Sequence, residues 1–191
     1  MGESFYYLIS SLPMLSLDDP DRMTDAAFMD LCRGCLPASL YASLGRVSLL
    51  PDHVPCCAVE RDWQVWETYV RNTIVSRRAG ARGRDISSHV RDDADVFPGD
   101  RRRVEGLFEG GDPLLRERDL DSLRWERLDD LGAGHDFDFD AVVLYRLRLL
   151  LTAKWHGRSA ENGLALRRSL IDRGVEQADA ACRTVKGQPE P

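Results

Sequence analysis

The stretch DFDFDAVVLYRLRLLLTAKW, residues 136–155, decides the fold that we expect for this chain. Placed on a helical wheel at about 100° per residue, it shows two apolar faces instead of one stripe. One face consists of Val143, Leu144, Leu147, Leu150, Leu151 and Trp155. The other consists of Val142, Tyr145, Leu149 and Ala153. A helix that is apolar on most sides is buried, so the sequence predicts a central helix at about 138–155 with neighbours on both flanks.

Polar residues limit this helix and mark its start. The gaps between the two faces hold Arg146, Arg148 and Thr152. The two arginines interrupt the apolar run too early for a transmembrane span. The start of the stretch is acidic, with Asp136, Asp138 and Asp140. Aspartate suits a helix N-terminus, where its oxygens accept from free N–H groups and its charge meets the helix dipole.

Length, composition and charge bound the class of protein. A chain of 191 residues with 43% hydrophobic residues can bury one core. The net charge of −6 argues against general nucleic-acid binding. The N-terminal MGESFYYLIS has no basic leader and only a short apolar run, which predicts no signal peptide. The five cysteines therefore suggest reduced thiols in a cytoplasmic protein.

Helical spacing of apolar residues recurs along the N-terminal half. Residues 4–12 favour a helix, although the aromatic and β-branched residues there leave a strand as the alternative. A second helix should begin at Thr24 or Asp25, and a short one should follow Pro37 and stop at Gly45. A long helix is predicted from about Cys57 to Ala79.

The C-terminal half repeats this pattern. We expect a short helix over 101–109, one from Asp112-Pro113 to Gly132, the central helix, and a last one from Arg158 to about Val185. Residues 80–100 are poor in apolar residues and indicate a linker, a mobile loop or the remnant of two shortened helices. The prediction is an all-α, elongated bundle that forms one domain over 1–185, in two helical halves, with a disordered tail at 186–191.

Three groups of residues could carry chemistry, and each also has a structural interpretation. Cys32 and Cys35 form a C-x-x-C that, with His53, Cys56 and Cys57, would be compatible with zinc or redox work. Because the motif falls near the end of a helix and lacks a second matched pair, we interpret these cysteines as small apolar residues.

The second group is the acidic turn around His135. A metal or acid/base cluster could be drawn from His135 with Asp129, Asp130, Asp136, Asp138 and Asp140. Neither Glu126 nor these aspartates have a matching acid/base partner that the sequence places in a pocket. Helix capping already explains aspartates at such a place.

The third group is the two runs of arginines. Arg77-Arg78 and Arg101-Arg102-Arg103 could bind phosphates or lipid headgroups, but a solvated face is the commoner meaning. We therefore expect no catalytic residue, cofactor or metal, and no enzyme activity.

Two segments resemble a small bacterial family of uncharacterised proteins encoded in operons for the V-type (A-type) rotary ATPase. They are FYYLISSLPMLSLDD, residues 5–19, and roughly residues 120–156, which contain LRWERLDDL and the central helix. That family is similar to the central-stalk connector of these enzymes in being all helical and in opening with a tyrosine-rich helix. It prescribes no functional residues.

The resemblance implies a cytoplasmic, non-catalytic subunit or assembly factor, held at the membrane through its complex. It would join the rotating central shaft to the proteolipid ring. This chain is much shorter than a full central-stalk connector, which implies a reduced version or a different role. Two alternatives come from the residues themselves. One is a free-standing helical binding module that uses the charged region 80–110, and the other is a small metal-dependent enzyme.

Overall fold

The computed structural model of the chain describes residues 2–19, 21–83, 85, 90–91, 97–156, 163–164 and 167–175. Every regular element in these ranges is an α-helix, apart from an isolated bridge between Ser16 and Asp19. The all-α prediction is therefore confirmed. None of the helices described is long and apolar enough to span a bilayer. The chain divides into two compact units, Met1–Lys154 and Trp155–Pro191, and each is described by itself.

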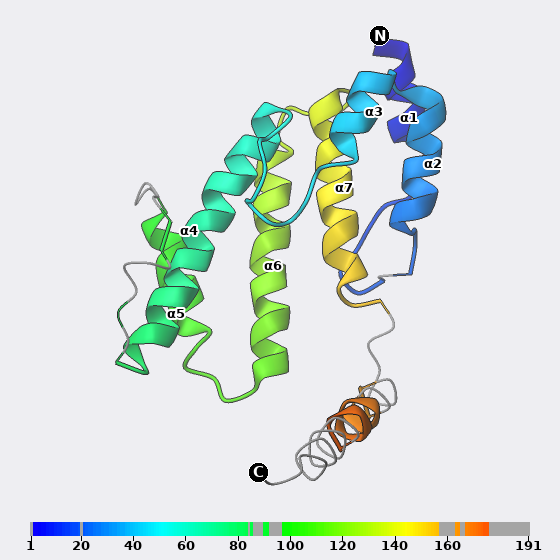
Figure 1. The fold of residues 1–191 in the computed structure, drawn as a ribbon. Helices are drawn as coiled ribbons and strands as arrows, with labels where there is room; N and C mark the ends of the chain where they lie inside the picture. Colours follow the sequence, from blue (N-terminus) through cyan, green and yellow to red (C-terminus); the bar gives the residue numbers. More distant parts are fainter. Residues whose placement is uncertain are drawn as a thin grey trace, which may run out of the picture. The chain divides into compact units, whose positions relative to one another are not determined.

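The first unit contains seven helices among its described residues (Figure 1). They are α1 (Gly2–Ser11), α2 (Asp25–Cys35), α3 (Ala38–Leu44), α4 (Ala58–Gly80), α5 (Pro98–Gly106), α6 (Pro113–Leu131) and α7 (Phe139–Ala153). The segment at 4–12 is helical, not a strand. The predicted helices at 24–36, after Pro37, at 57–79 and from Asp112 all exist within a residue or two of their predicted limits.

Side-chain caps explain why several helices start where they do. Thr24 accepts from the Ala27 N–H at 3.2 Å, and Asp112 accepts from the Leu114 N–H at 2.8 Å. Asp138 is the N-cap of α7, because its Oδ1 accepts from the Ala141 N–H at 2.8 Å.

The prediction for α5 was wrong by three residues at each end. Proline fits the first helical position, where a backbone N–H has no partner to lose, so α5 begins at Pro98.

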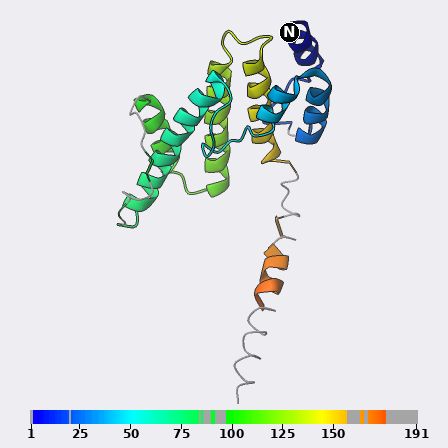
Figure 2. The same ribbon diagram turned by 45° about the horizontal axis from the view of Figure 1, so that its top comes forward.

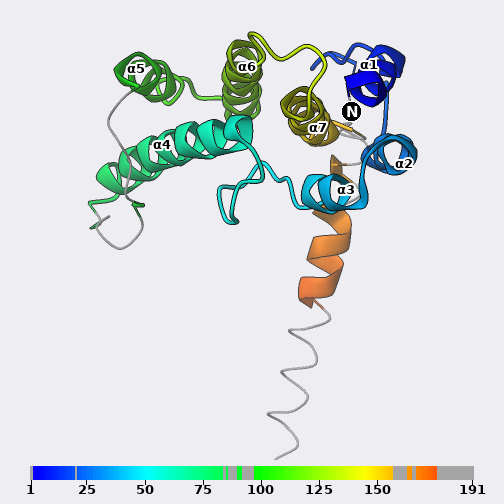
Figure 3. The same cartoon turned by 90° about the horizontal axis from the view of Figure 1, so that it is seen from above.

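Helix α7 lies between two groups of helices. It packs against α4 and α6 on one flank and against α1 and α2 on the other, as the view from above shows (Figures 1 and 3). Most of its side chains are buried, including Val142, Val143, Leu144, Leu147, Leu149 and Leu151. The prediction of a buried central helix is confirmed. Ala153, from the second apolar face, is exposed, whereas Arg146 and Thr152 from the gaps are buried.

Two tryptophans fill the core where α4 meets its neighbours. Trp63 and Trp66 have no exposed surface, and their ring centroids lie 5.5 Å apart. The Trp66 indole N–H donates to Asp100 at 2.7 Å, which fixes α5 against α4. Helices α4 and α5 pack against each other (Figures 1 and 2). The turn between α6 and α7 contains Gly134, whose φ of +89° suits glycine.

A network of buried charges joins α4, α6 and the end of α7. Arg124 of α6 donates to both carboxylate oxygens of Glu67 at 2.9 and 3.0 Å and to Asp121 at 2.9 Å. Glu67 and Asp121 are 1% and 0% exposed. Lys154 also reaches Asp121, at 2.8 Å, and Glu117, at 2.7 Å. Burial lowers the pKa of Arg124, but the carboxylate of Glu67 and its hydrogen bonds more than offset this and raise the pKa above its ordinary value.

The second unit is described only at residues 155–156, 163–164 and 167–175. Residues 167–175 are helical, which confirms the middle of the last predicted helix. Its predicted ends at Arg158 and Val185, and the tail at 186–191, lie outside the described residues. Four of the apolar side chains described there are exposed, namely Leu164, Leu170, Ile171 and Val175, whereas Trp155 is half-buried.

Only part of the predicted linker at 80–100 lies within the described residues, and its mobility stays a prediction. Helix α4 ends at Gly80, and α5 already begins at Pro98, inside the predicted linker. Arg91 is tied to α4 through its backbone. The Asn72 side-chain amide donates to the Arg91 carbonyl at 2.8 Å and accepts from the Arg91 N–H at 3.1 Å.

Candidate functional site

A groove lies between the N-terminal segment and helices α6 and α7. It consists of two neighbouring hollows of about 270 and 500 Å³. The walls that they share come from three parts of the chain and are Leu12, Asp129, Tyr145 and Arg148. We call this feature the N-terminal groove. It brings together the two segments, 5–19 and 120–156, that carried the resemblance.

Tyr145 of α7 holds the N-terminal segment in place. Its phenol O–H donates to the Pro13 carbonyl at 2.9 Å, and its ring stacks on Phe28 of α2 at a centroid distance of 5.2 Å. Burial raises the pKa of Tyr145 to about 12, so the phenol stays protonated and can donate at neutral pH. Across the groove, Arg148 donates to Asp129 at 2.8 Å and to the Leu128 carbonyl at 3.1 Å.

Large apolar side chains are exposed on the segments that line this groove. Met14 is 87% exposed and lines the larger hollow, and Tyr6 is 58% exposed. The Tyr6 ring lies 4.8 Å from the ring of Phe137, which is itself half exposed. Tyr6, Met14 and Phe137 are called the apolar rim here, and Tyr7 beside them on α1 is exposed as well. Such aromatic residues and methionine are enriched at protein–protein interfaces.

The sequence pattern did not single out this rim. Tyr6 was noted for its place in a helix or strand and in the tyrosine-rich segment of the resemblance, and Phe137 as part of the capping segment, but neither as exposed. Their contact joins residues from the first helix and from the turn before α7, so no local spacing reveals it. The available signal was the excess of aromatic residues on α1 over what one buried face needs, since Leu8 is the fully buried residue among those described on that helix.

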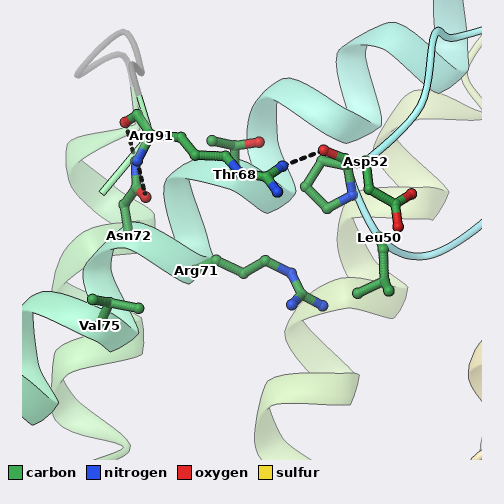
Figure 4. A pocket seen from close by; sticks show the side chains of 8 residues that line it. Leu50, Asp52, Thr68, Arg71, Asn72, Val75 and Arg91 are labelled. Carbon is green, nitrogen blue, oxygen red and sulfur yellow. Dashed lines mark hydrogen bonds between the residues drawn. The ribbon is translucent and has the colours of Figure 1, made fainter. Parts of the chain in front are cut away.

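A second hollow, of about 360 Å³, lies beside α4 and the loop at 50–52 (Figure 4). Arg91 reaches across Thr68 and donates to the Pro51 carbonyl, while its backbone is held by Asn72. Arg71 in the same wall donates to Glu67 at 2.7 Å. The polar groups of this hollow therefore hold the chain together, and we assign it a structural role.

The four cysteines among the described residues are reduced thiols, and burial raises the pKa of three of them. Cys32 is buried in α2, where burial and then the neighbouring Cys35 raise the pKa of its thiol to about 12. Burial and a hydrogen bond with Glu60 raise the pKa of Cys56 to about 12, and the pKa of Cys57 is also raised by burial. Thiolates, not thiols, act as nucleophiles and metal ligands. Cys182 lies outside the described residues.

The structure brings the ligand atoms of only three of the acidic-turn residues close together. Ligand atoms of His135, Asp138 and Asp140 lie within 4.8 Å of one another, a spacing that could hold a cation. All three are half-buried and already engaged. His135 Nδ1 lies 2.7 Å from Asp138, whose other oxygen caps α7, and Asp140 accepts from the Val59 N–H at 3.2 Å. Asp140 thus caps α4 from α7, and the capping interpretation explains both aspartates.

The remaining acidic candidates serve elsewhere or stay on the surface. Asp129 pairs with Arg148, and Glu126 pairs with Arg103 at 2.7 Å. Asp130 and Asp136 are exposed, and Asp136 lines the smaller hollow of the groove. Among the arginine runs, Arg101 lies over the ring of Tyr69, with 5.6 Å to its centroid. Arg77 and Arg78 line a separate hollow at the end of α4.

Fold and groove define this chain as an all-α protein with exposed aromatic side chains near a groove. Comparison with family models adds one finding. Residues 100–177 match the model of a family described as a protein of unknown function (DUF2764). The matched range includes α6 and α7, so it covers one wall of the N-terminal groove. No curated protein and no solved structure matches the chain.

Proposed function

We propose that this protein is a non-catalytic subunit or assembly factor of a V/A-type rotary ATPase. In this role it connects the rotating central shaft to the membrane proteolipid ring. It would be a cytoplasmic protein that reaches the membrane only through the complex. The proposal starts from the resemblance of residues 5–19 and 120–156 to the family encoded in ATPase operons.

One observation supports a role for these segments as a unit. The 5–19 segment packs on α6 and α7 through the Tyr145 hydrogen bond to Pro13 and through an ion pair between Arg118 and Asp18. The same segments expose the apolar rim of Tyr6, Met14 and Phe137, in which the rings of Tyr6 and Phe137 touch. A surface that exposes large apolar side chains beside a groove is suited to bind another protein.

The packed helices behind the N-terminal groove suit a protein that transmits force within a complex. A connector transmits force and needs buried helices that resist shear, not a reactive centre. Helix α7 is packed on both flanks, and buried charges join its C-terminal end to α4 and α6 through Arg124 and Lys154. The free-standing binding module remains the alternative. The sequence assigned its contact to the charged region 80–110, and the exposed rim offers a second surface for a partner of another kind.

Co-purification tests the proposal. The tagged protein, produced in its own host, should bring down the shaft proteins of the ATPase together with the proteolipid. The double variant Tyr6→Ala/Met14→Ala should lose most of this yield while its thermal melting stays unchanged, since both side chains are exposed. The control Val54→Ala/Leu115→Ala removes two other exposed apolar side chains and should bind normally.

Two results would contradict the proposal. The tagged protein could elute alone while its deletion leaves ATP-driven ion transport intact. Alternatively, it could capture a partner through the rim that does not belong to the ATPase. The second result would establish the binding module and remove the ATPase role.

A further inference from the structure

An arginine-lined hollow of about 370 Å³ lies at the C-terminal end of α4, beside the segment that joins α5 to α6. Its walls are Arg77, Arg78, Ala81, Arg82, Phe108 and Arg116. Three of the four arginines come from the last turns of α4 and the residues after it, and Arg116 comes from the first turns of α6. The hollow is separate from the N-terminal groove and shares no wall with it.

Part of this hollow is preorganised. Arg116 donates from Nε to the Leu107 carbonyl at 3.1 Å and from Nη2 to the Gly110 carbonyl at 2.9 Å. Its guanidinium lies 4.7 Å from the centroid of the Phe108 ring. The guanidinium of Arg78 lies over the same ring at 5.9 Å. Phe108 thus fixes the positions of two cations, and ordering them beforehand lowers the entropy lost when a ligand binds.

Positive charge dominates the hollow. In the part of the chain that the structure describes, no carboxylate pairs with Arg77, Arg78, Arg82 or Arg116. By contrast, Arg103 pairs with Glu126, and Arg124 pairs with Glu67 and Asp121. The C-terminal dipole of α4 offers only about half a negative charge. Four neighbouring cations therefore favour the entry of an anion that relieves their repulsion.

From this geometry we infer that the hollow binds a multiply charged phosphate group, of the kind carried by diphosphates and triphosphates. The planar guanidinium donates two parallel hydrogen bonds to phosphate oxygens, which makes arginine the preferred phosphate ligand. A single carboxylate would leave most of the positive charge unmatched. A hollow of this volume is within the range of small-ligand sites, about 300–1,000 Å³.

The charge of the whole chain narrows the source of the phosphate. The net charge of −6 disfavours long polyanions such as nucleic acid, because the chain as a whole repels them. A short soluble polyphosphate places its charge inside the hollow alone. This inference does not depend on the proposed function, since it concerns different residues and a different ligand.

Isothermal titration with inorganic tripolyphosphate, at about physiological salt, tests the inference. The wild-type protein should bind one equivalent. Arg78→Ala/Arg82→Ala should weaken binding by about tenfold or more, because each lost arginine removes charged hydrogen bonds. Arg116→Lys keeps the charge, loses the planar fork and should also bind more weakly. The control Arg22→Ala/Arg61→Ala removes two exposed arginines that pair with Asp19 and Asp62 and should bind like wild type.

Three further ligands distinguish binding of a soluble polyphosphate from binding of other anions or of a lipid headgroup. Hexaglutamate and citrate should bind far more weakly than tripolyphosphate, and phosphatidylcholine vesicles doped with phosphatidylinositol bisphosphate should not out-compete it. The inference is overturned if wild-type protein binds no tripolyphosphate, or if the control pair loses as much affinity as the hollow variants. It is also overturned if hexaglutamate binds equally well, or if only the vesicles bind. Circular dichroism melting of every variant verifies that each is folded.

Discussion

The two flanks of α7 are closed by different chemistry. Towards α4 and α6, the contact ends in the buried charges of Glu67, Asp121 and Arg124. Towards α1 and α2, it ends in the stacked rings of Phe28 and Tyr145. The charged flank is enclosed and satisfied internally, whereas the aromatic flank opens onto the N-terminal groove. The difference separates an enclosed, charged side of the bundle from a side that borders a groove, where the proposed function places a partner.

Each flank also buries one arginine, and their surroundings differ. Arg124 lies between two carboxylates that have almost no access to water. Arg146 donates to the Leu44 carbonyl and to Asp25 at 3.1 Å, but the Asp25 side chain is about a third exposed. A carboxylate that reaches water can replace a lost partner by solvent, and one that is enclosed cannot. The two arginines therefore provide a direct test of the comparison.

The largest effect is expected for Arg124→Ala. This variant leaves Glu67 and Asp121 buried without the guanidinium that joins them, and such a loss costs about 3–5 kcal/mol of unfolding free energy. Urea denaturation measures the change. As a control, Arg103→Ala breaks the exposed pair with Glu126 and should cost less than about 1 kcal/mol. Equal losses in the two variants would show that burial is not what makes the network important.

Arg146→Ala should cost less than Arg124→Ala, about 2 kcal/mol in the same urea experiment. The buried Leu44 carbonyl loses its donor, but Asp25 can turn to water. Arg148→Ala, also on α7, removes a more exposed pair with Asp129 and serves as the matched control. If Arg146→Ala is as costly as Arg124→Ala, the aromatic flank is as closed as the charged one, and the comparison fails.

Tyr145→Phe should cost about 1 kcal/mol, because it removes the hydrogen bond to the Pro13 carbonyl and keeps the ring on Phe28. The loss should be local. Hydrogen exchange of the amides around residues 12–15 should become faster, while exchange in α4 should stay as slow as in wild type. Uniform acceleration through both flanks would show that the N-terminal segment is not a separately anchored part.

The smallest effect is the pH dependence that His53 contributes next to the start of α4. Burial lowers the pKa of His53, but hydrogen bonds to Glu60 at 2.7 Å and Asp52 at 3.2 Å outweigh it and raise the pKa above 6.5. A raised folded pKa adds stability that is complete below 6.5 and is lost as the pH rises through the folded value.

Melting temperatures measured between about pH 5.5 and pH 8 check this contribution. Over that range the wild-type value should fall more than that of His53→Gln, which lacks the titrating ring. The pKa of His135 is also raised, mainly by its hydrogen bond to Asp138. The variant His135→Gln therefore tests in the same way how much this histidine, at the start of α7, contributes to the pH dependence. If the melting temperatures of wild type and His53→Gln change with pH in parallel, His53 does not contribute to the pH dependence of stability.

Short-range patterns predicted most of the helices. Thr24 and Asp112 were recognised as helix starts because a cap acts within three residues of its own position. The wheel at 136–155 showed correctly that α7 has neighbours on both flanks. Helix α5 was misplaced because its apolar pattern is weak, with Val104 as its one buried residue, and the proline signal at Pro98 was passed over.

The candidate site depended on contacts that no local pattern contains. The wheel placed Arg146 in a polar gap, yet its partner Asp25 lies 121 residues away, and burial follows from that pair. Asp140 was assigned to the start of α7, and the structure shows that it also caps α4 through Val59. The arginines at 77 and 78 come to lie beside Phe108 only after α4 packs next to the segment that joins α5 to α6.

Local patterns were enough to predict that this protein is helical and that one helix is buried on both flanks, because helical spacing and capping act over a few residues. Which charges are enclosed, which aromatic residues stay exposed and where arginines gather became visible only once the helices were packed together. Those outcomes depend on burial and on partners far away in the chain, since the free energy of a charged or apolar group is set by its surroundings in space.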